Sequence, residues 1–330
     1  MKKLFWFSIS FLILMNSCED KNLTDLETRL ISLLDSDDIS GVDGFETNGD
    51  AELDFETGLE TQGAYKILSD TLVYENGYKI RFGRQITDKN RTIEFDIGSD
   101  TTIALVTYNI NGVLNVKSFD TTDNIQIDSM SFSKDFSTTF VRKVRFVQID
   151  NPNEPDGSEW EINALTPLIG VSGDKVTISS ISIYEVTDAM EKGALLHQFN
   201  ANGIENLFIN RESLPVFNAY SPYVIEVSVN NVGPELSIDT TNVGEWVFKN
   251  YGRRFNVRGR KHLNDEGVIL DSILNDNIHS GVWRAHGPGL GLQRRGFRSF
   301  FETVDLATIF VEDDGYNTSI WSIPYKIQRP

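Results

Sequence analysis

The sequence predicts a mostly β protein: two antiparallel, sandwich-like domains that follow a short N-terminal helix and an acidic leader. Short segments rich in aromatic and β-branched residues recur at roughly 8–12-residue spacing, with turn-forming residues between them. A clear helical period appears only in a short segment after Thr24. The composition agrees with this class, because 40% hydrophobic residues in a chain of 330 are sufficient for packed cores.

Residues 1–17 have the features of an export signal. Lys2 and Lys3 precede an almost unbroken apolar run over residues 4–15. This run is shorter than the ~20 residues that a membrane-spanning helix needs. It ends in LMNSC at residues 14–18, which resembles the lipobox of bacterial lipoproteins. The resemblance implies that Cys18 carries the lipid, including a palmitate-type acyl chain.

The alternative is an ordinary secretory signal followed by a chance cysteine. The position of Cys18 disfavours it, because the only cysteine of the chain stands at the predicted cleavage point. Once Cys18 is acylated, no thiol remains for a disulfide or a catalytic cysteine.

Residues 18–63 are predicted to be an acidic tether with one short helix. Residues 19–60 contain 14 carboxylates, and their only basic residues are Lys21 and Arg29. Thr24 and Glu27 fit a capping box, and a stripe of leucines follows until the helix ends near residues 35–38. The rest is interpreted as a solvated spacer, and removal of the whole leader, helix included, should leave both β cores folded in residues 64–330.

A first β domain is predicted over residues 64–190. Asn76-Gly77 and Asn111-Gly112 indicate tight hairpin turns. The expected strands are 65–68, 71–74, 78–82, 92–97, 101–109, 113–119, 125–132, 141–149, 160–164 and 176–186.

Residues 191–214 are predicted to connect the two domains, with a short helix over 189–199. The second domain covers residues 215–330, which is the length of one immunoglobulin-like sandwich. Its expected strands are 223–229, 246–251, 254–257, 278–284, 296–303, 307–311 and 320–327.

The segment over residues 264–283 is similar to part of the immunoglobulin-like modules of secreted bacterial proteins. In those modules an Asp-Asp-Gly turn and a spacer precede Asp-Gly, a small hydroxyl residue, Gly and a strand containing Trp. Here Asn277 stands where Gly is usual, and asparagine also tolerates a left-handed backbone. The resemblance implies an extracellular β-sandwich module and no reaction.

No motif predicts catalysis, so the expected function is non-enzymatic. Ser131 and Lys134 match Ser-x-x-Lys, but they lie in a predicted strand, where chance explains the match better. Acidic turns over 150–156, 265–276 and 312–315 could bind Ca²⁺, although polar turns are the favoured interpretation. No cofactor or metal site is therefore predicted. The four histidines, which show no metal-ligand spacing, are His197, His262, His279 and His286.

Basic residues are concentrated between Lys249 and Arg298, a range that contains ten Lys or Arg and four acidic residues. This cluster could bind an anionic glycan or a lipid phosphate, dock on the acidic leader of the same chain, or simply be solvated. The last two alternatives are favoured together. The candidate anion-binding residues are Arg253, Arg254, Arg258, Arg260, Arg294, Arg295 and Arg298.

The sequence thus predicts a lipid-anchored protein of the bacterial cell envelope, expected at the outer membrane, that acts by binding or assembly. Its partners would be the membrane and, further, envelope proteins or anionic glycans. After removal of residues 1–17 the formal charge is −20, which argues against nucleic acid. The alternatives are an envelope hydrolase without a recognisable motif and a carbohydrate-binding accessory protein that stacks sugars on Trp246, Trp283 and Trp321. The ligand, the membrane leaflet and the oligomeric state stay open.

Overall fold

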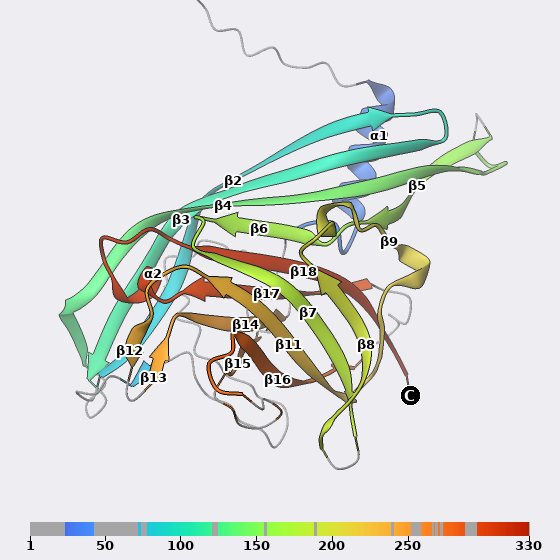
Figure 1. Ribbon diagram of the computed structural model, residues 1–330. Helices are drawn as coiled ribbons and strands as arrows, with labels where there is room; N and C mark the ends of the chain where they lie inside the picture. The colour runs from blue at the N-terminus through green and yellow to red at the C-terminus, as the bar shows by residue number, and fades with distance from the viewer. Residues whose placement is uncertain are drawn as a thin grey trace, which may run out of the picture.

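The computed structural model describes residues 24–42, 72–73, 78–120, 125–154, 157–187, 190–238, 241–251, 259–265, 267, 270, 273–287 and 296–329. Antiparallel strands dominate these residues, and one 12-residue helix precedes them (Figure 1). The mostly β class with a short N-terminal helix is therefore confirmed.

In chain order the elements are α1 (Asp25–Ser36), β1 (Leu72–Val73), β2 (Tyr78–Ile97), β3 (Thr101–Asp120), β4 (Gln126–Asp150), β5 (Ser158–Leu165), β6 (Leu168–Ser172), β7 (Val176–Val186), β8 (Lys192–Asn200), η1 (Ile204–Asn206), β9 (Ile209–Asn210), η2 (Arg211–Ser213), β10 (Val216–Asn218), β11 (Pro222–Asn231), β12 (Leu236–Ile238), β13 (Thr241–Val243), β14 (Glu245–Tyr251), β15 (Gly259–Leu263), β16 (Ile278–Arg284), β17 (Gly296–Asp305), α2 (Ala307–Phe310) and β18 (Thr318–Gln328).

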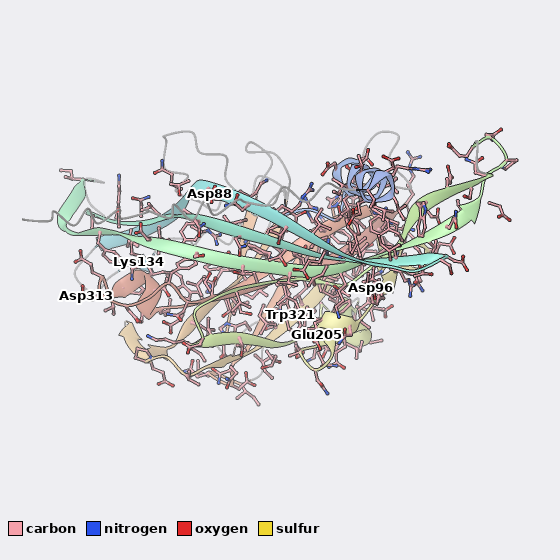
Figure 2. The ribbon with its side chains drawn as sticks, turned by 90° about the horizontal axis from the view of Figure 1, so that it is seen from above. Asp88, Asp96, Lys134, Glu205, Asp313 and Trp321 are labelled. Atoms are coloured by element: carbon pink, nitrogen blue, oxygen red, sulfur yellow. The ribbon has the colours of Figure 1, made fainter. Side chains whose placement is uncertain are left out.

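Most strands belong to one large sheet of 12 strands. Its main order is β1-β2-β3-β4-β6-β18-β17-β14-β15. Three further strands branch from this order, since β10 pairs with β18, β5 pairs with β4, and β9 pairs with β5. Strands β2, β3 and β4 have 20, 20 and 25 residues and pair antiparallel along most of their length. They run along the whole molecule in both views (Figures 1 and 2).

A smaller sheet, in the order β16-β11-β7-β8, packs on one face of the large sheet. The alternation along β17 shows how the two cores are divided. Phe301 lies in the core between the sheets, whereas Phe300 and Val304 lie in a second core on the opposite face. The large sheet therefore has hydrophobic side chains on both of its faces.

The expectation of two separate sandwiches differs from the observed pairing. β6 comes from the predicted first domain and β18 from the second, yet they are neighbours in the large sheet. β7 of the first predicted domain likewise pairs with β11 of the second. Both sheets thus combine strands from either side of the predicted connection, because backbone partners can be far apart in the sequence.

The predicted helix over residues 189–199 is wrong, since β8 occupies this segment. β8 forms a hairpin with β7, and Phe199 is buried in the core between the sheets. Pairing and burial override the local preference of residues such as Ala and Leu for helix. The expected strand over 307–311 is also wrong, since α2 (Ala307–Phe310) lies there.

The predicted turn at Asn111-Gly112 is wrong as well, because β3 continues through it. Gly112 pairs with Phe136 of β4 in an unbroken part of the ladder. A Cβ atom at Gly112 would lie 2.2 Å from the main-chain oxygen of Gln85 and 2.7 Å from the Phe136 ring. Glycine is present for this close approach and not for a turn. The predicted turn at Asn76-Gly77 and the strands over 65–68 and 254–257 lie outside the described residues.

Helix α1 begins with the predicted capping box. The Glu27 main-chain nitrogen donates to the Thr24 hydroxyl, and the Thr24 main-chain nitrogen donates to the Glu27 carboxylate. Leu30 and Leu34 are buried beside β5, and Ile39 and Val42 extend the contact with the same core. Residues 24–42 are therefore part of the hydrophobic core, which differs from the expected dispensable spacer.

Truncating Leu30 to alanine should destabilise the fold by about 2–5 kcal/mol, because it leaves a cavity under a fully buried side chain. The measurement is urea unfolding of the mature chain in nonionic detergent. Ser32→Ala, on the exposed side of the same helix, is the matched control and should change the free energy of unfolding little. Equal effects of the two substitutions would show that α1 is not part of the core.

Candidate functional site

The large sheet curls until its first strands face its last ones. Four strands separate β2 from β17 in the sheet order, yet Arg84 of β2 contacts Glu302 of β17. The Phe82 ring stacks on Trp246 of β14 with ring centroids 6.1 Å apart. The face that carries these residues is therefore concave, and its inward positions are enclosed.

An ion pair lies inside this concave face. Arg84 donates to both oxygens of Glu302, at 2.6 and 3.1 Å, and to the Tyr316 hydroxyl at 3.0 Å. Asn250 donates to the same carboxylate at 3.1 Å. Glu302 is only 1% exposed, and burial raises the pKa of Tyr316. This pair joins opposite walls of the curled sheet.

A second polar group, called here the arginine cluster, consists of Arg142 of β4, Arg298 of β17 and Arg211 of η2. It lies under the N-terminal segment. Arg142 Nη1 donates to the Ile39 carbonyl at 2.5 Å, and Arg298 Nη1 donates to the Asp38 carbonyl at 3.3 Å. Arg211 forms an ion pair with the Asp37 carboxylate. Three guanidinium groups thus bind Asp37, Asp38 and Ile39, which directly follow α1.

Arg142 is the most unusual member of the arginine cluster. It is 2% exposed, and its Nε and Nη2 atoms have no hydrogen-bond partner among the residues that the structure describes. Burial lowers the pKa of Arg142 to about 9, and the charge of Arg298 adds to this shift. Its neighbours at inward positions of β4, Phe140 and Val144, are apolar. A charged group with open donors therefore stands in an otherwise apolar row.

The structure places the predicted anion-binding residues only in part. Arg298 belongs to the arginine cluster. Its hydrogen bond to the Asp38 carbonyl is the kind of contact expected if the basic residues dock on the leader of the same chain. Arg260 pairs in register with Asn250. The remaining candidates, together with Cys18, lie outside the described residues: Arg253, Arg254, Arg258, Arg294 and Arg295.

Sequence reasoning missed Arg142 and Arg211. Arg142 follows Phe140 by two residues and precedes Val144 by two, so the period of a strand places it on the apolar face. That signal was present in the sequence. Arg211 offered no such signal, because its position depends on the distant partner Asp37.

The three tryptophans proposed as a stacking row are buried in the cores. Trp246, Trp283 and Trp321 are 9%, 7% and 3% exposed. Lys249 lies over the Trp283 ring at 4.4 Å, so that ring already has a cationic partner. The geometry therefore gives no support to carbohydrate stacking on these residues.

Two lysines hold the acidic turn over residues 312–315. Lys175 pairs with both oxygens of Asp314, and Lys134 donates to the main-chain oxygens of Val311 and Asp314. Figure 2 shows Lys134 and Asp313 at the same end of the long strands. Lysine ammonium groups thus bind oxygens that a calcium ion would use. In the described part of the chain, no group of three or more His, Cys, Asp or Glu side chains is arranged to hold a metal ion.

Ser131 and Lys134 do not form a catalytic pair. Both lie in β4, three positions apart, which places them on opposite faces of the strand. The strand expected at the Ser-x-x-Lys match is observed, since both residues lie in β4.

The segment similar to immunoglobulin-like modules has the predicted left-handed asparagine, since Asn277 has a φ of 61°. Asp265 accepts hydrogen bonds from the main-chain nitrogens of Asp276 and Asn277, which fixes the turn before β16. In β16, the His279 ring is 3.0 Å from the Glu245 carboxylate of β14. This buried contact links the small sheet to the large one.

The free energy of unfolding should fall in acid as Glu245 becomes protonated. Burial alone would raise the pKa of Glu245, but His279 and Asn231 hold it below its ordinary value. A lowered pKa contributes stability above the pKa of the unfolded state, and this contribution is lost as the pH falls through the folded-state pKa. We expect the free energy of unfolding to depend less steeply on pH, between about pH 6 and pH 3, in Glu245→Gln than in the parent chain. If the free energy of unfolding depends on pH equally in both proteins, Glu245 does not contribute in this way.

Comparison with known proteins adds no family. No protein-family model matches the chain, and no curated protein matches it significantly. No helix within the described ranges is long and apolar enough to cross a membrane. The class that fold and site define is a mostly β protein of two antiparallel sheets with a buried arginine cluster beneath its N-terminal segment.

Proposed function

We propose that this chain is a lipid-anchored protein of the bacterial cell envelope that acts by binding or assembly and not by catalysis. The lipobox-like segment that ends at Cys18 supports the anchor. Only six residue steps separate Cys18 from Thr24, the N-cap of α1, so this connection reaches at most roughly 20 Å. A lipid on Cys18 would therefore hold the N-terminal end of α1 near the membrane surface, while the arginine cluster lies at the other end of this helix.

The observation that supports the binding part of the proposal is the open edge of Arg142, which is the side of its guanidinium formed by Nε and Nη2. Buried polar groups are almost always hydrogen-bonded, so a buried group without a partner among the described residues needs an explanation, and a bound ion is one. Donors of a fixed guanidinium suit recognition of an oxyanion. A protein held by a lipid would present this site to a partner in the periplasm or outside the cell.

We further propose that the small sheet, together with β6, β18, β17 and β14, is an immunoglobulin-like module. The face-to-face packing of two antiparallel sheets supports it, as do the buried Trp283 and the left-handed Asn277. The predicted boundaries, 64–190, 191–214 and 215–330, stay a prediction. β7 and β8 would have to belong to this module, since they pair with β11.

The test of the anchor is metabolic labelling of a bacterium that expresses the full chain, with an alkyne analogue of palmitate. We expect label on the mature protein and sedimentation with the membranes. Protease treatment of intact cells then tells the surface from the periplasmic side. An unlabelled, freely soluble mature protein would refute the proposal.

A further inference from the structure

The open edge of Arg142 has the shape of an oxyanion site. A guanidinium has five N–H donors in a plane, and the Nε and Nη2 hydrogens lie parallel along one edge. Nη1 is already used, because it donates to the Ile39 carbonyl. Nε and Nη2 are buried and have no hydrogen-bond partner in the described part of the chain. The unused part of Arg142 is thus the edge that binds two oxygens of one carboxylate or phosphate.

The charge around Arg142 also favours an anion. Arg298 and Arg211 add positive charge near it, whereas Tyr108 and the Asp37 carboxylate act in the opposite direction. That carboxylate is already paired with Arg211. A buried charge without a counter-ion is strongly unfavourable, so an arginine at an inward position between Phe140 and Val144 needs a compensating group.

The N-terminal segment contacts the same guanidinium next to this edge, at Nη1. Ile39 and Val42 are each 1% exposed and pack in the core of the concave face. The carbonyls of Asp38 and Ile39 are the groups that occupy Arg298 and Arg142. A neutral carbonyl satisfies one donor but does not compensate a charge, so an oxyanion would be the stronger partner.

We propose that the arginine cluster is a binding site for an oxyanion, a carboxylate or a phosphate group, held by the Nε–Nη2 edge of Arg142 in competition with residues 37–42. This deepens the proposed function and rests on its binding part, not on the lipid anchor. When the oxyanion binds, residues 37–42 leave the cluster. The segment that joins the fold to Cys18 then responds to the ligand.

The experiment uses the mature lipidated chain in nonionic detergent. The probes are sodium phosphate and sodium acetate, each compared with sodium chloride at the same ionic strength, and binding is measured by calorimetric titration and by Tm. We expect saturable binding and a rise in Tm with at least one oxyanion and none with chloride. The phosphate and acetate arms show which oxyanion the site prefers.

Three variants locate the site. Arg142→Met should weaken binding by about tenfold or more, the loss expected for charge-assisted hydrogen bonds. Arg145→Met is the matched control, because Arg145 lies on the opposite face of β4, bound to Asn163 and Asn210, and should bind as the parent does. Leu30→Ala loosens the N-terminal segment and should strengthen binding a few-fold, since it raises the population of the open state.

Arg142→Lys serves if Arg142→Met does not fold. It keeps the positive charge but has no two-point edge, so it should fold and bind more weakly than the parent. The proposal is overturned if neither oxyanion binds, or if the parent, Arg142→Lys and Arg145→Met respond alike. That outcome would leave the fatty-acid labelling of the chain unaffected, so it would not be mistaken for a failure of the anchor.

Discussion

Cys18→Ala should release the chain from the membrane completely. Acyl chains on Cys18 would bury several tens of methylene groups, each worth about 0.8 kcal/mol, in the bilayer. The measurement is detergent phase separation of whole-cell extracts: the parent should enter the detergent phase and the variant the aqueous phase.

Met15→Leu is the control for this experiment. It changes the same segment but brings it closer to the usual lipobox, so the protein should remain in the detergent phase. Retention of Cys18→Ala in the membrane would mean that another part of the chain binds lipid, and the anchor assignment would then be wrong.

Arg84→Met should lower the free energy of unfolding by about 3–5 kcal/mol. The substitution removes the guanidinium that binds both oxygens of Glu302 and leaves a carboxylate that is 1% exposed without this cation. Asn250 remains as a donor, but an amide does not compensate a charge. Urea unfolding of the mature chain in detergent measures the effect.

Two further variants separate the charge from the packing. The double variant Arg84→Met/Glu302→Met removes both charges and should recover most of the loss, because a buried ion pair is often replaceable by apolar side chains. Arg91→Met breaks the more exposed pair with Asp35, at 2.6 Å, and should cost only about 0–1 kcal/mol. If Arg84→Met costs no more than Arg91→Met, the ion pair of the concave face has no special weight.

The features that the sequence predicted correctly depend on neighbouring residues. The capping box at Thr24 and the left-handed backbone at Asn277 follow from side chains within a few positions. The burial of Leu30 and Leu34 follows from the helical period in the same way. These features could be found without knowing any distant contact.

The features that were missed depend on partners far along the chain. Asn111-Gly112 has the residues of a turn, but the close approach of Phe136 makes it part of a long strand. The pairing of β6 with β18 and the curl of the sheet have no local signal. The arginine cluster as a whole was missed for the same reason, since it combines β4, β17, η2 and residues 37–39, although Arg142 by itself had a local signal. Of the predicted anion-binding residues, Arg298 is the one whose side chain the structure describes, and it belongs to the cluster.

The place of β18 in the large sheet determines when the fold can be completed. β18 follows all the other described strands in the sequence, yet it is an inner strand that pairs with β6, β17 and β10. Synthesis from the N-terminus therefore produces β2, β3 and β4 long before β18 can connect their part of the sheet to β17. Until β18 is made, β6 and β17 each lack this partner, and exposed strand edges of this kind invite aggregation.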